Sequence, residues 1–133
     1  MAYEESLKSV SLDADATVAL YTGVPGLPGS AVPNSGHQYK FVKITGRHQV
    51  GLAVADGPAV GVLQNKPQVT GQAATVGFIG ISTVRTGGAV AAGAAVSSDA
   101  SGRAVTAGSG AKLGVAIEAS TGADELIAIL LTI

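Results

Sequence analysis

The sequence predicts an all-β domain, folded as a sandwich or a barrel, from three observations. Short runs of β-branched and aliphatic residues recur along the chain and are cut by Gly, Pro, Asp and Asn. A helical spacing of apolar residues is nearly absent beyond residue 20, where glycines recur every few positions. The chain has 133 residues, which is the size of a single domain.

Ten strands are predicted, because each segment is rich in Val, Ile, Leu, Thr or Ala and lies between turn-forming residues. In chain order they cover residues 17–22, 38–45, 49–55, 59–64, 73–79, 82–85, 94–97, 104–106, 112–118 and 126–131. In the strand 38–45, Phe41 lies on one face and Val42 and Ile44 lie on the other. Both faces are partly apolar, so we expect this strand to be covered on both sides. The strand 126–131 is apolar throughout, so it should be central or buried by a second subunit.

Two turns are predicted more sharply than the strands. The Asp-Gly pair at positions 56–57 is a strong hairpin signal between the strands 49–55 and 59–64. Residues 98–102 predict a second hairpin, between the strands 94–97 and 104–106, in which Gly102 is free to take a positive φ.

A weak internal repeat suggests a duplicated β-unit. Each copy has a Gly-Val pair, a polar loop, a Thr-Gly pair and then an apolar strand. The first copy runs from Gly61 to Phe78 and the second from Gly114 to Ile129. A hairpin that carries an Ala-Val pair, at positions 53–54 or 104–105, precedes each copy.

The first 36 residues differ from the rest of the chain. Residues 1–10 carry charges without a regular pattern, and residues 23–36 are rich in Pro and Gly. Such a composition favours an extended, polyproline-like loop. We therefore divide the chain into an N-terminal arm with a Pro/Gly-rich loop, residues 1–36, and a β-domain, residues 37–133.

Composition argues against several classes of function. The eight Lys and Arg residues are scattered and the net charge is −1, so a nucleic acid is not expected as a partner. The chain has no cysteine, which excludes disulfides, thiolate metal sites and thiol catalysis. No apolar run approaches the ~20 residues needed to cross a bilayer, and the acidic start lacks the basic residues of a secretory signal. We expect a soluble, unprocessed chain without a membrane partner.

No motif nominates an active site. His37 and His48 are the two possible proton shuttles at neutral pH, and neither lies in a recognisable motif. The Asp pair at positions 13 and 15 lacks the rest of a calcium loop, and the carboxylates at 124 and 125 should point to opposite faces of a strand. The glycine-rich segments lack the lysine and the helix of a phosphate loop. We therefore expect no catalytic residues, no metal site and no cofactor, and hence no enzyme.

The apolar excess predicts association with other protein surfaces. Apolar residues make up 47% of the chain and charged residues 13%, and the mean hydropathy is positive. Soluble monomers rarely expose apolar patches larger than a few hundred Å². An obligate oligomer with a charge-poor interface would bury this surface.

Several segments in order resemble the tailed-phage capsid decoration, or cement, proteins. The similarity covers about residues 37–131. The segments that carry it are 38–44 (Gln-Tyr-Lys-Phe-Val-Lys-Ile), 59–67, 71–76, 87–93, 96–104, 114–119 and 125–131. Each segment alone has low specificity, and their order and spacing carry the resemblance.

The resemblance implies a small β-sandwich or tulip-like barrel of short antiparallel strands with an extended N-terminal arm. It implies a structural virion protein, made in the bacterial host cytoplasm and located on the outer surface of the capsid. There it would assemble as a homotrimer, bind the major capsid protein where its subunits meet, and stabilise the shell. Residues 1–36 would reach along the capsid or a neighbouring subunit. The apolar arm residues expected to contact the capsid are Tyr3, Leu7, Val10, Leu12, Val18, Leu20 and Tyr21.

Two alternatives come from other classes of protein. A carbohydrate-binding or adhesin β-sandwich module would need exposed aromatic residues for stacking, and the chain has only five aromatic residues. A small hydrolase would have only His37 or His48 as its base.

Overall fold

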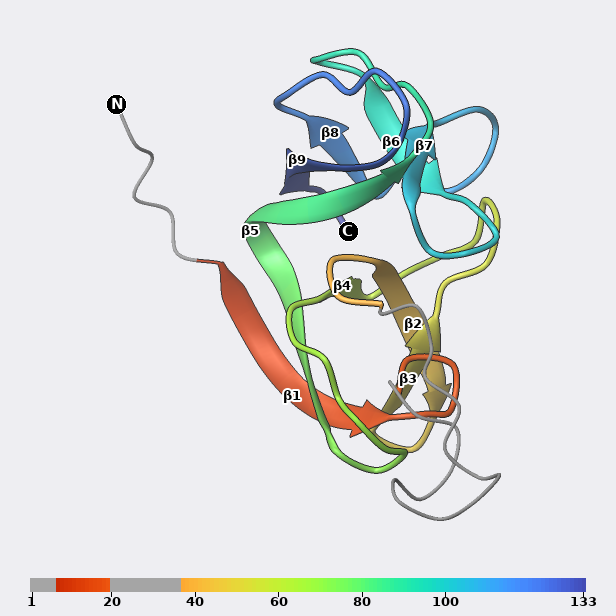
Figure 1. Ribbon diagram of the computed structural model, residues 1–133, viewed down its shortest axis with the longest axis vertical. Helices are drawn as coiled ribbons and strands as arrows, with labels where there is room; N and C mark the ends of the chain where they lie inside the picture. Colours follow the sequence, from red (N-terminus) through yellow and green to blue (C-terminus); the bar gives the residue numbers. More distant parts are fainter. Residues whose placement is uncertain (1–6, 20–36) are drawn as a thin grey trace.

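The computed structural model describes residues 7–19 and 37–133, and these ranges contain strands and no helix, which confirms the predicted all-β class (Figure 1). The nine strands are β1 (Lys8–Ala14), β2 (Phe41–Gly46), β3 (Gln49–Leu52), β4 (Gly61–Leu63), β5 (Ala73–Gly87), β6 (Ala95–Ser98), β7 (Ala104–Thr106), β8 (Gly114–Ala116) and β9 (Ala123–Leu131). Apart from the first, the predicted strands overlap these elements.

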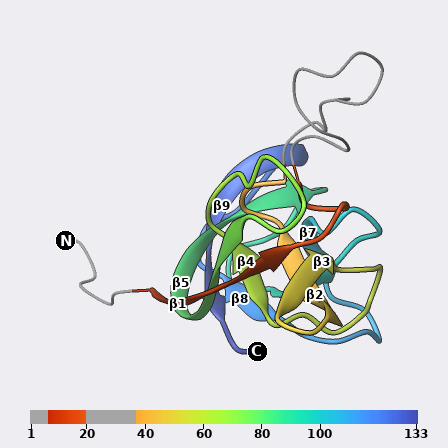
Figure 2. The ribbon, with the colours of Figure 1, turned by 90° about the horizontal axis from the view of Figure 1, so that it is seen from below.

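The strands form one mixed, mostly antiparallel sheet in the order β1-β3-β2-β4-β5-β7-β6-β8-β9. Two further pairings, β1 with β5 and β5 with β9, close this sheet into two five-stranded rings that share β5. The first ring contains β1 to β4 and the N-terminal half of β5, and the second contains the C-terminal half of β5 and β6 to β9. In Figure 1, β5 passes from the lower ring into the upper one, and Figure 2 views the molecule from the end formed by the first ring.

The two rings have the same connectivity, which supports the predicted duplication of a β-unit. In each ring a hairpin (β2–β3 or β6–β7) pairs through its first strand with a short strand (β4 or β8). The short strand pairs with a long one (β5 or β9). The ring closes through β1 or the C-terminal half of β5, which runs antiparallel to the long strand and parallel to the second hairpin strand.

The register of the strands fixes which residues are equivalent. Val42 lies opposite Gly61 in the first ring, and Val96 lies opposite Gly114 in the second. The two Gly-Val pairs of the sequence repeat are therefore equivalent. The two Ala-Val pairs are not equivalent. In the hairpins, Val50 lies opposite the residue two positions after Val42, and Ala104 lies opposite the residue two positions after Val96, so Ala104 corresponds to Val50.

The buried side chains form two cores. The first core fills the first ring, and its buried members are Ala14, Val18, Val42, Val50, Leu63, Ala74 and Val76. The second core fills the second ring and extends between the rings, where Phe41, Ala53 and Val62 from the first ring join it. Phe41 and Val42 are both fully buried on opposite faces of β2. This confirms that the start of the strand is covered on both sides, whereas Ile44, further along the same face as Val42, is 52% exposed.

The predicted strand 17–22 is wrong where the structure describes it, because residues 17–19 form a turn after β1. The carboxylate of Asp15 accepts the backbone N–H of Thr17 (2.7 Å) and its hydroxyl (2.5 Å), which turns the chain away from the sheet. The strand lies earlier, at Lys8–Ala14, within the segment predicted to be an arm. Its last residue, together with Val18, is buried in the first core.

Two further predictions are corrected by the pairing. The predicted strands 73–79 and 82–85 are one strand, because Gly80 takes a φ of 113° and continues the strand from one ring into the other. The hairpin predicted at positions 56–57 does not form, because β3 and β4 both pair with β2 and not with each other. The second predicted hairpin, β6–β7, is confirmed, and Gly102 has a φ of 75°.

Candidate functional site

The described residues hold no constellation suited to catalysis. They contain no group of three or more acidic or histidine side chains that could hold a metal ion. His37 precedes β2, whereas His48 lies in the β2–β3 turn with a φ of 54°. Within the described ranges no helix is long and apolar enough to cross a membrane. The candidate sites are therefore surfaces, and four features of the molecule could serve as one.

The first feature is the strand β1, which carries or adjoins four of the predicted contact residues. Val10 is 45% exposed, while Leu7 and Leu12 are partly buried. Val18 is 2% exposed and belongs to the first core, so its side chain is unavailable to a partner. Tyr3, Leu20 and Tyr21 lie outside the described residues. Of the predicted contact residues that the structure describes, Val10 is therefore the one with an exposed side chain.

The backbone of β1 is also accessible. From Lys8 to Asp13 the strand pairs with β5, but its pairing with β3 is limited to Asp13 and Ala14. The opposite edge of residues 8–12 thus has no strand partner among the described residues. An unpaired edge presents N–H and C=O groups to which another strand can add.

The second feature is an apolar patch outside the second ring, which we call the β9 face. Register places Ile81 beside Leu130, and Leu130 beside Val115. Leu126 (48% exposed), Leu130 (44%) and Ile117 (40%) lie open on this side. The strand prediction for 126–131 pointed to this face: β9 is central between β5 and β8, and its outward side chains are apolar and uncovered by the described part of the chain.

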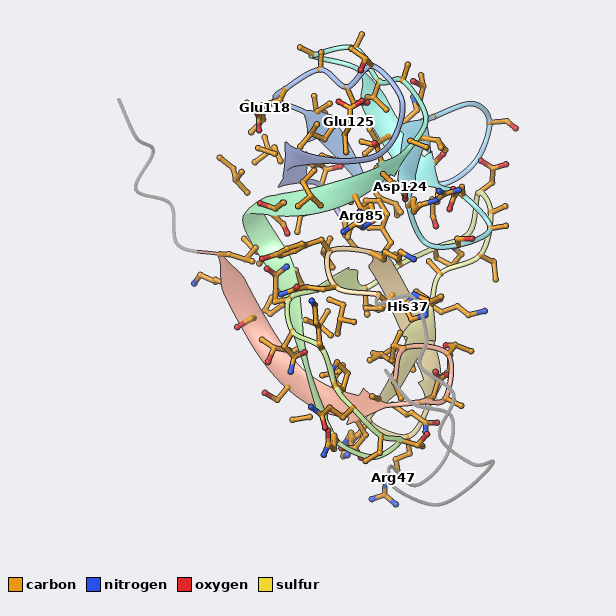
Figure 3. The ribbon with its side chains drawn as sticks, viewed as in Figure 1. His37, Arg47, Arg85, Glu118, Asp124 and Glu125 are labelled. Atoms are coloured by element: carbon orange, nitrogen blue, oxygen red, sulfur yellow. The ribbon has the colours of Figure 1, made fainter. Side chains whose placement is uncertain are left out.

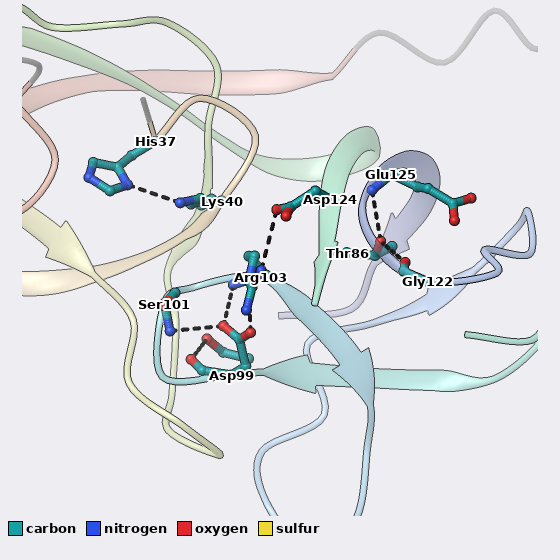
Figure 4. A network of polar contacts seen from close by, with 10 residues as sticks. His37, Lys40, Thr86, Asp99, Ser101, Arg103, Gly122, Asp124 and Glu125 are labelled. Atoms are coloured by element: carbon teal, nitrogen blue, oxygen red, sulfur yellow. Dashed lines mark hydrogen bonds and ion pairs between the residues drawn. The ribbon is translucent and has the colours of Figure 1, made fainter. Parts of the chain in front are cut away.

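The third feature is a polar network at the junction between the rings (Figure 4). The guanidinium of Arg103 pairs with the carboxylates of Asp99 (2.9 Å) and Asp124 (3.3 Å). Arg85 donates from Nη1 to the carbonyl of Asp124 (3.3 Å). Figure 3 shows Arg85 and Asp124 near the junction, with Arg47 at the far end of the first ring. The network joins β5, the β6–β7 turn and the start of β9, so it ties the second ring together.

Lys40 is a buried cation that is influenced by the charges of this network. Its side chain is only 6% exposed, and its Nζ donates to Nδ1 of His37 (3.1 Å). Burial lowers the pKa of Lys40, and the charges of Arg103 and Arg85 lower it further. Burial, with the charge of Lys40, lowers the pKa of His37 to about 4. His37 is therefore neutral at pH 7 and accepts the hydrogen bond of the lysine, which is a structural role.

The carboxylates at 124 and 125 point in different directions, so they do not form a paired site. Asp124 turns toward Arg103 with a φ of 62°, whereas Glu125 accepts the hydroxyl of Thr121 (2.8 Å). That hydrogen bond lowers the pKa of Glu125. Thr86 donates to the carbonyl of Gly122 (2.8 Å) and accepts the N–H of Glu125 (3.1 Å), which fixes the turn before β9.

The fourth feature is a groove in the first ring with a volume of about 230 Å³. Its lining residues come from β2 and from the segment before β4; they are Lys43, Ile44, Pro58, Ala59 and Val60. Ile44 is 52% exposed. The sequence predicted neither this groove nor the junction network, because their members are separated along the chain and no local pattern marks them.

Comparison with known proteins gives a family match. The family model described as phage cement protein matches residues 33–131, which is most of the chain. No curated protein matches the sequence.

A solved structure is similar in fold. It is the head fiber gp8.5 N base in bacteriophage phi29, with a TM-score of 0.65 and 16% sequence identity. The similarity covers 96% of this chain and 95% of that chain. At this level of identity the similarity concerns the fold alone.

Proposed function

Since this chain belongs to the phage cement protein family, we propose that it binds the outer surface of the phage head where major capsid protein subunits meet, and stabilises the shell. Membership of this family makes it a structural protein of the phage virion and not an enzyme, as the sequence predicted. The proposal includes three specific points: the location at subunit junctions, assembly as a homotrimer, and the residues that contact the capsid.

The observation that carries the proposal is the exposed edge of β1. On the edge away from β5, residues 8–12 offer backbone groups that no described strand pairs, and Val10 adds an exposed apolar side chain in the same strand. A strand or an extended segment of the capsid protein can pair with this edge, and its side chains can pack on Val10. Main-chain hydrogen bonds of this kind give attachment without a deep pocket.

The β9 face supports the second part of the proposal, which is self-association as a homotrimer. Leu126 and Leu130 are nearly half exposed and lie on a strand whose other face is core. Contact with further copies would remove this apolar surface from water. A trimer presents three β1 edges, so several weak contacts act together on one shell.

Stabilisation of the shell follows from mass action. A protein that binds the closed shell and not its separated subunits shifts the equilibrium toward the closed shell. No covalent step or cofactor is required. The aromatic residues offer little support for a carbohydrate site in the described ranges, because Phe41 is fully buried and Tyr39 and Phe78 are partly buried.

The test is cryo-electron microscopy of purified phage heads that lack this protein, with and without the added chain. We expect extra density at the junctions of capsid protein subunits. Heads that carry the chain should also keep their DNA to a higher temperature than bare heads. Bare heads in the presence of excess chain would contradict the proposal.

A substitution tests the β1 edge. Val10→Asp should weaken head binding about tenfold or more, because it places a charge where an apolar contact is proposed. The matched control is Ile133→Asp, since Ile133 is also 45% exposed but lies at the other end of the chain. Equal binding of both variants would remove β1 from the contact.

A further inference from the structure

The groove of the first ring has an equivalent in the second ring, and the backbone defines the correspondence. In the first ring the N–H of Val60 donates to the carbonyl of Val42 (2.8 Å). In the second ring the N–H of Leu113 donates to the carbonyl of Val96 (2.8 Å). The residues that follow Val42 and precede Val60 therefore correspond to those that follow Val96 and precede Leu113.

This correspondence gives each groove residue a counterpart. The counterparts of Lys43, Ile44, Pro58, Ala59 and Val60 are Ser97, Ser98, Ala111, Lys112 and Leu113. The two sets have the same backbone frame and differ in their side chains.

In the second ring this site is already covered by an acidic turn of the same chain. The N–H of Asp56 donates to the carbonyl of Ser98 (2.9 Å), and the N–H of Ala111 donates to the carbonyl of Asp56 (3.1 Å). The hydroxyl of Ser97 lies 3.5 Å from Oδ1 of Asp56. Under this turn Ser97 and Ser98 are 0% and 1% exposed. In Figure 1 the connection from β3 to β4, which carries the turn, extends up to the second ring.

In the first ring no described segment takes the place of that turn. Ile44, the counterpart of the buried Ser98, is 52% exposed, and the groove beside it is about 230 Å³. Lys43 stands where the second ring has Ser97, so a hydroxyl that faces a carboxylate is replaced by an ammonium group. Among the described residues no carboxylate pairs with Lys43.

We propose that this groove binds an acidic turn of a partner protein, in the way that the second ring holds the Asp56 turn. The ammonium of Lys43 would pair with the carboxylate of the turn, and its apolar residues would cover Ile44 and Val60. If the proposed function holds, the partner is the major capsid protein.

A second copy of the chain is a weaker occupant. The loop of the second ring that corresponds to the Asp56 turn lies at residues 107–110 and reads Ala-Gly-Ser-Gly. It has no acidic residue, so a neighbouring copy does not offer a carboxylate from the equivalent place. The charge of Lys43 therefore favours a different protein.

The direct test uses the full chain and a probe peptide. The probe is a cyclic peptide with the sequence of residues 53–59 (Ala-Val-Ala-Asp-Gly-Pro-Ala), and its binding is followed by NMR on the ¹⁵N-labelled protein. We expect shift changes centred on Lys43, Ile44 and Val60. Asn in place of Asp in the peptide should weaken binding about tenfold, and so should Lys43→Glu in the protein. Lys66→Glu, which changes an exposed lysine elsewhere, is the control and should bind as the unchanged protein does.

Each outcome decides the assignment. Absence of shifts at millimolar peptide, or equal binding by Lys43→Glu, would overturn it. Self-association that Ile44→Asp abolishes would assign the groove to a second copy and overturn it as well.

Head binding separates this inference from the proposed function. If the unchanged chain binds heads and Lys43→Glu binds equally well, the groove does not hold the capsid protein. If the unchanged chain ignores heads but binds the peptide through the groove, the proposed function fails and the groove assignment stands.

Discussion

At the scale of single residues, the least usual group is the buried amine of Lys40. A buried cation is normally paired with a carboxylate, yet the polar atom bonded to this amine is Nδ1 of His37. Asp99 and Asp124 oppose the lowering of its pKa, but both are bonded to Arg103. The amine and the imidazole therefore depend on each other: His37 must stay neutral to accept the hydrogen bond of Lys40.

This dependence gives the stability of the protein a pH sensitivity. The pKa of His37 is lowered from 6.5 to about 4 in the folded protein, so between these values the unfolded chain binds more protons. The contribution of His37 to stability is fully present above pH 6.5 and is lost progressively as the pH falls toward 4. Urea unfolding at a series of pH values should show this decline. His37→Gln should flatten it in that window, and an unchanged slope would contradict the assignment.

A second prediction concerns Lys40 itself. Lys40→Met keeps most of the side-chain volume and removes a buried charge, so the free energy of unfolding should stay the same or rise by about 1–2 kcal/mol. The pKa of His37 should rise, because the charge of Lys40 helps to lower it. NMR titration of His37 measures the shift. Lys66→Met, at an exposed position, is the control and should change neither quantity.

At the scale of elements, each copy of the duplicated unit requires a glycine at the same position. Gly61 and Gly114 begin the equivalent short strands β4 and β8. A Cβ at Gly61 would collide with the carbonyl of Gly77, and one at Gly114 would lie 2.6 Å from the carbonyl of Leu130. Both glycines are required because the neighbouring strand passes close to the Cα, and a backbone carbonyl cannot move aside without loss of strand pairing.

The expected result is that both substitutions destabilise the protein by similar amounts. Gly61→Ala and Gly114→Ala should each lower the free energy of unfolding by about 1–3 kcal/mol, the range typical of overpacking. Gly88→Ala is the matched control, because no atom lies within 4 Å of the position that the added methyl group would take. It should change stability by less than about 0.5 kcal/mol. A loss confined to one ring would argue against equivalent packing.

The strands also show which structural features a local sequence pattern can predict. Alternation within 38–45 correctly predicted burial on both faces at Phe41 and Val42, since a strand's period of two fixes which residues share a face. It did not predict that Ile44, on the same face as Val42, would be exposed. The Asp-Gly signal at 56–57 failed, because β2 lies between β3 and β4 and the turn is held instead by Ser98 and Ala111. An Asp-Gly pair indicates a local turn. It does not determine whether the two strands that flank the turn pair with each other or with a third strand between them.

At the scale of the whole molecule, two fused rings of the same connectivity have different surroundings. Phe41 and Val62 of the first ring pack into the second core, so the side of the first ring that faces the second is covered. The outer side of the second ring, the β9 face, is covered by nothing within the described chain. Equivalent units are therefore buried to different extents, and this difference leaves apolar side chains of the second ring exposed.

The β9 face makes a prediction about assembly. Leu130→Asp should convert the proposed homotrimer to a monomer at micromolar concentration, because each copy would bury a charge in an apolar contact. Sedimentation velocity measures the change. Ile44→Asp, at a similarly exposed residue of the first ring, should leave the assembly intact. A monomeric unchanged chain would remove the trimer from the proposal.

The sequence by itself determined the all-β class, the two-sided burial at the start of β2 and the repeat of the Gly-Val segments. These follow from short-range alternation and turn residues, which act between neighbours in the chain. Only the tertiary structure decided that β5 belongs to both rings and that the Asp56 turn docks on the second ring. It also decided that Lys40 bonds to His37 and that the charges of Arg85 and Arg103 lower its pKa. These features depend on which distant segments of the chain pair with and bury one another. The native pairing is the one that minimises exposed apolar surface and unpaired polar groups over the entire chain.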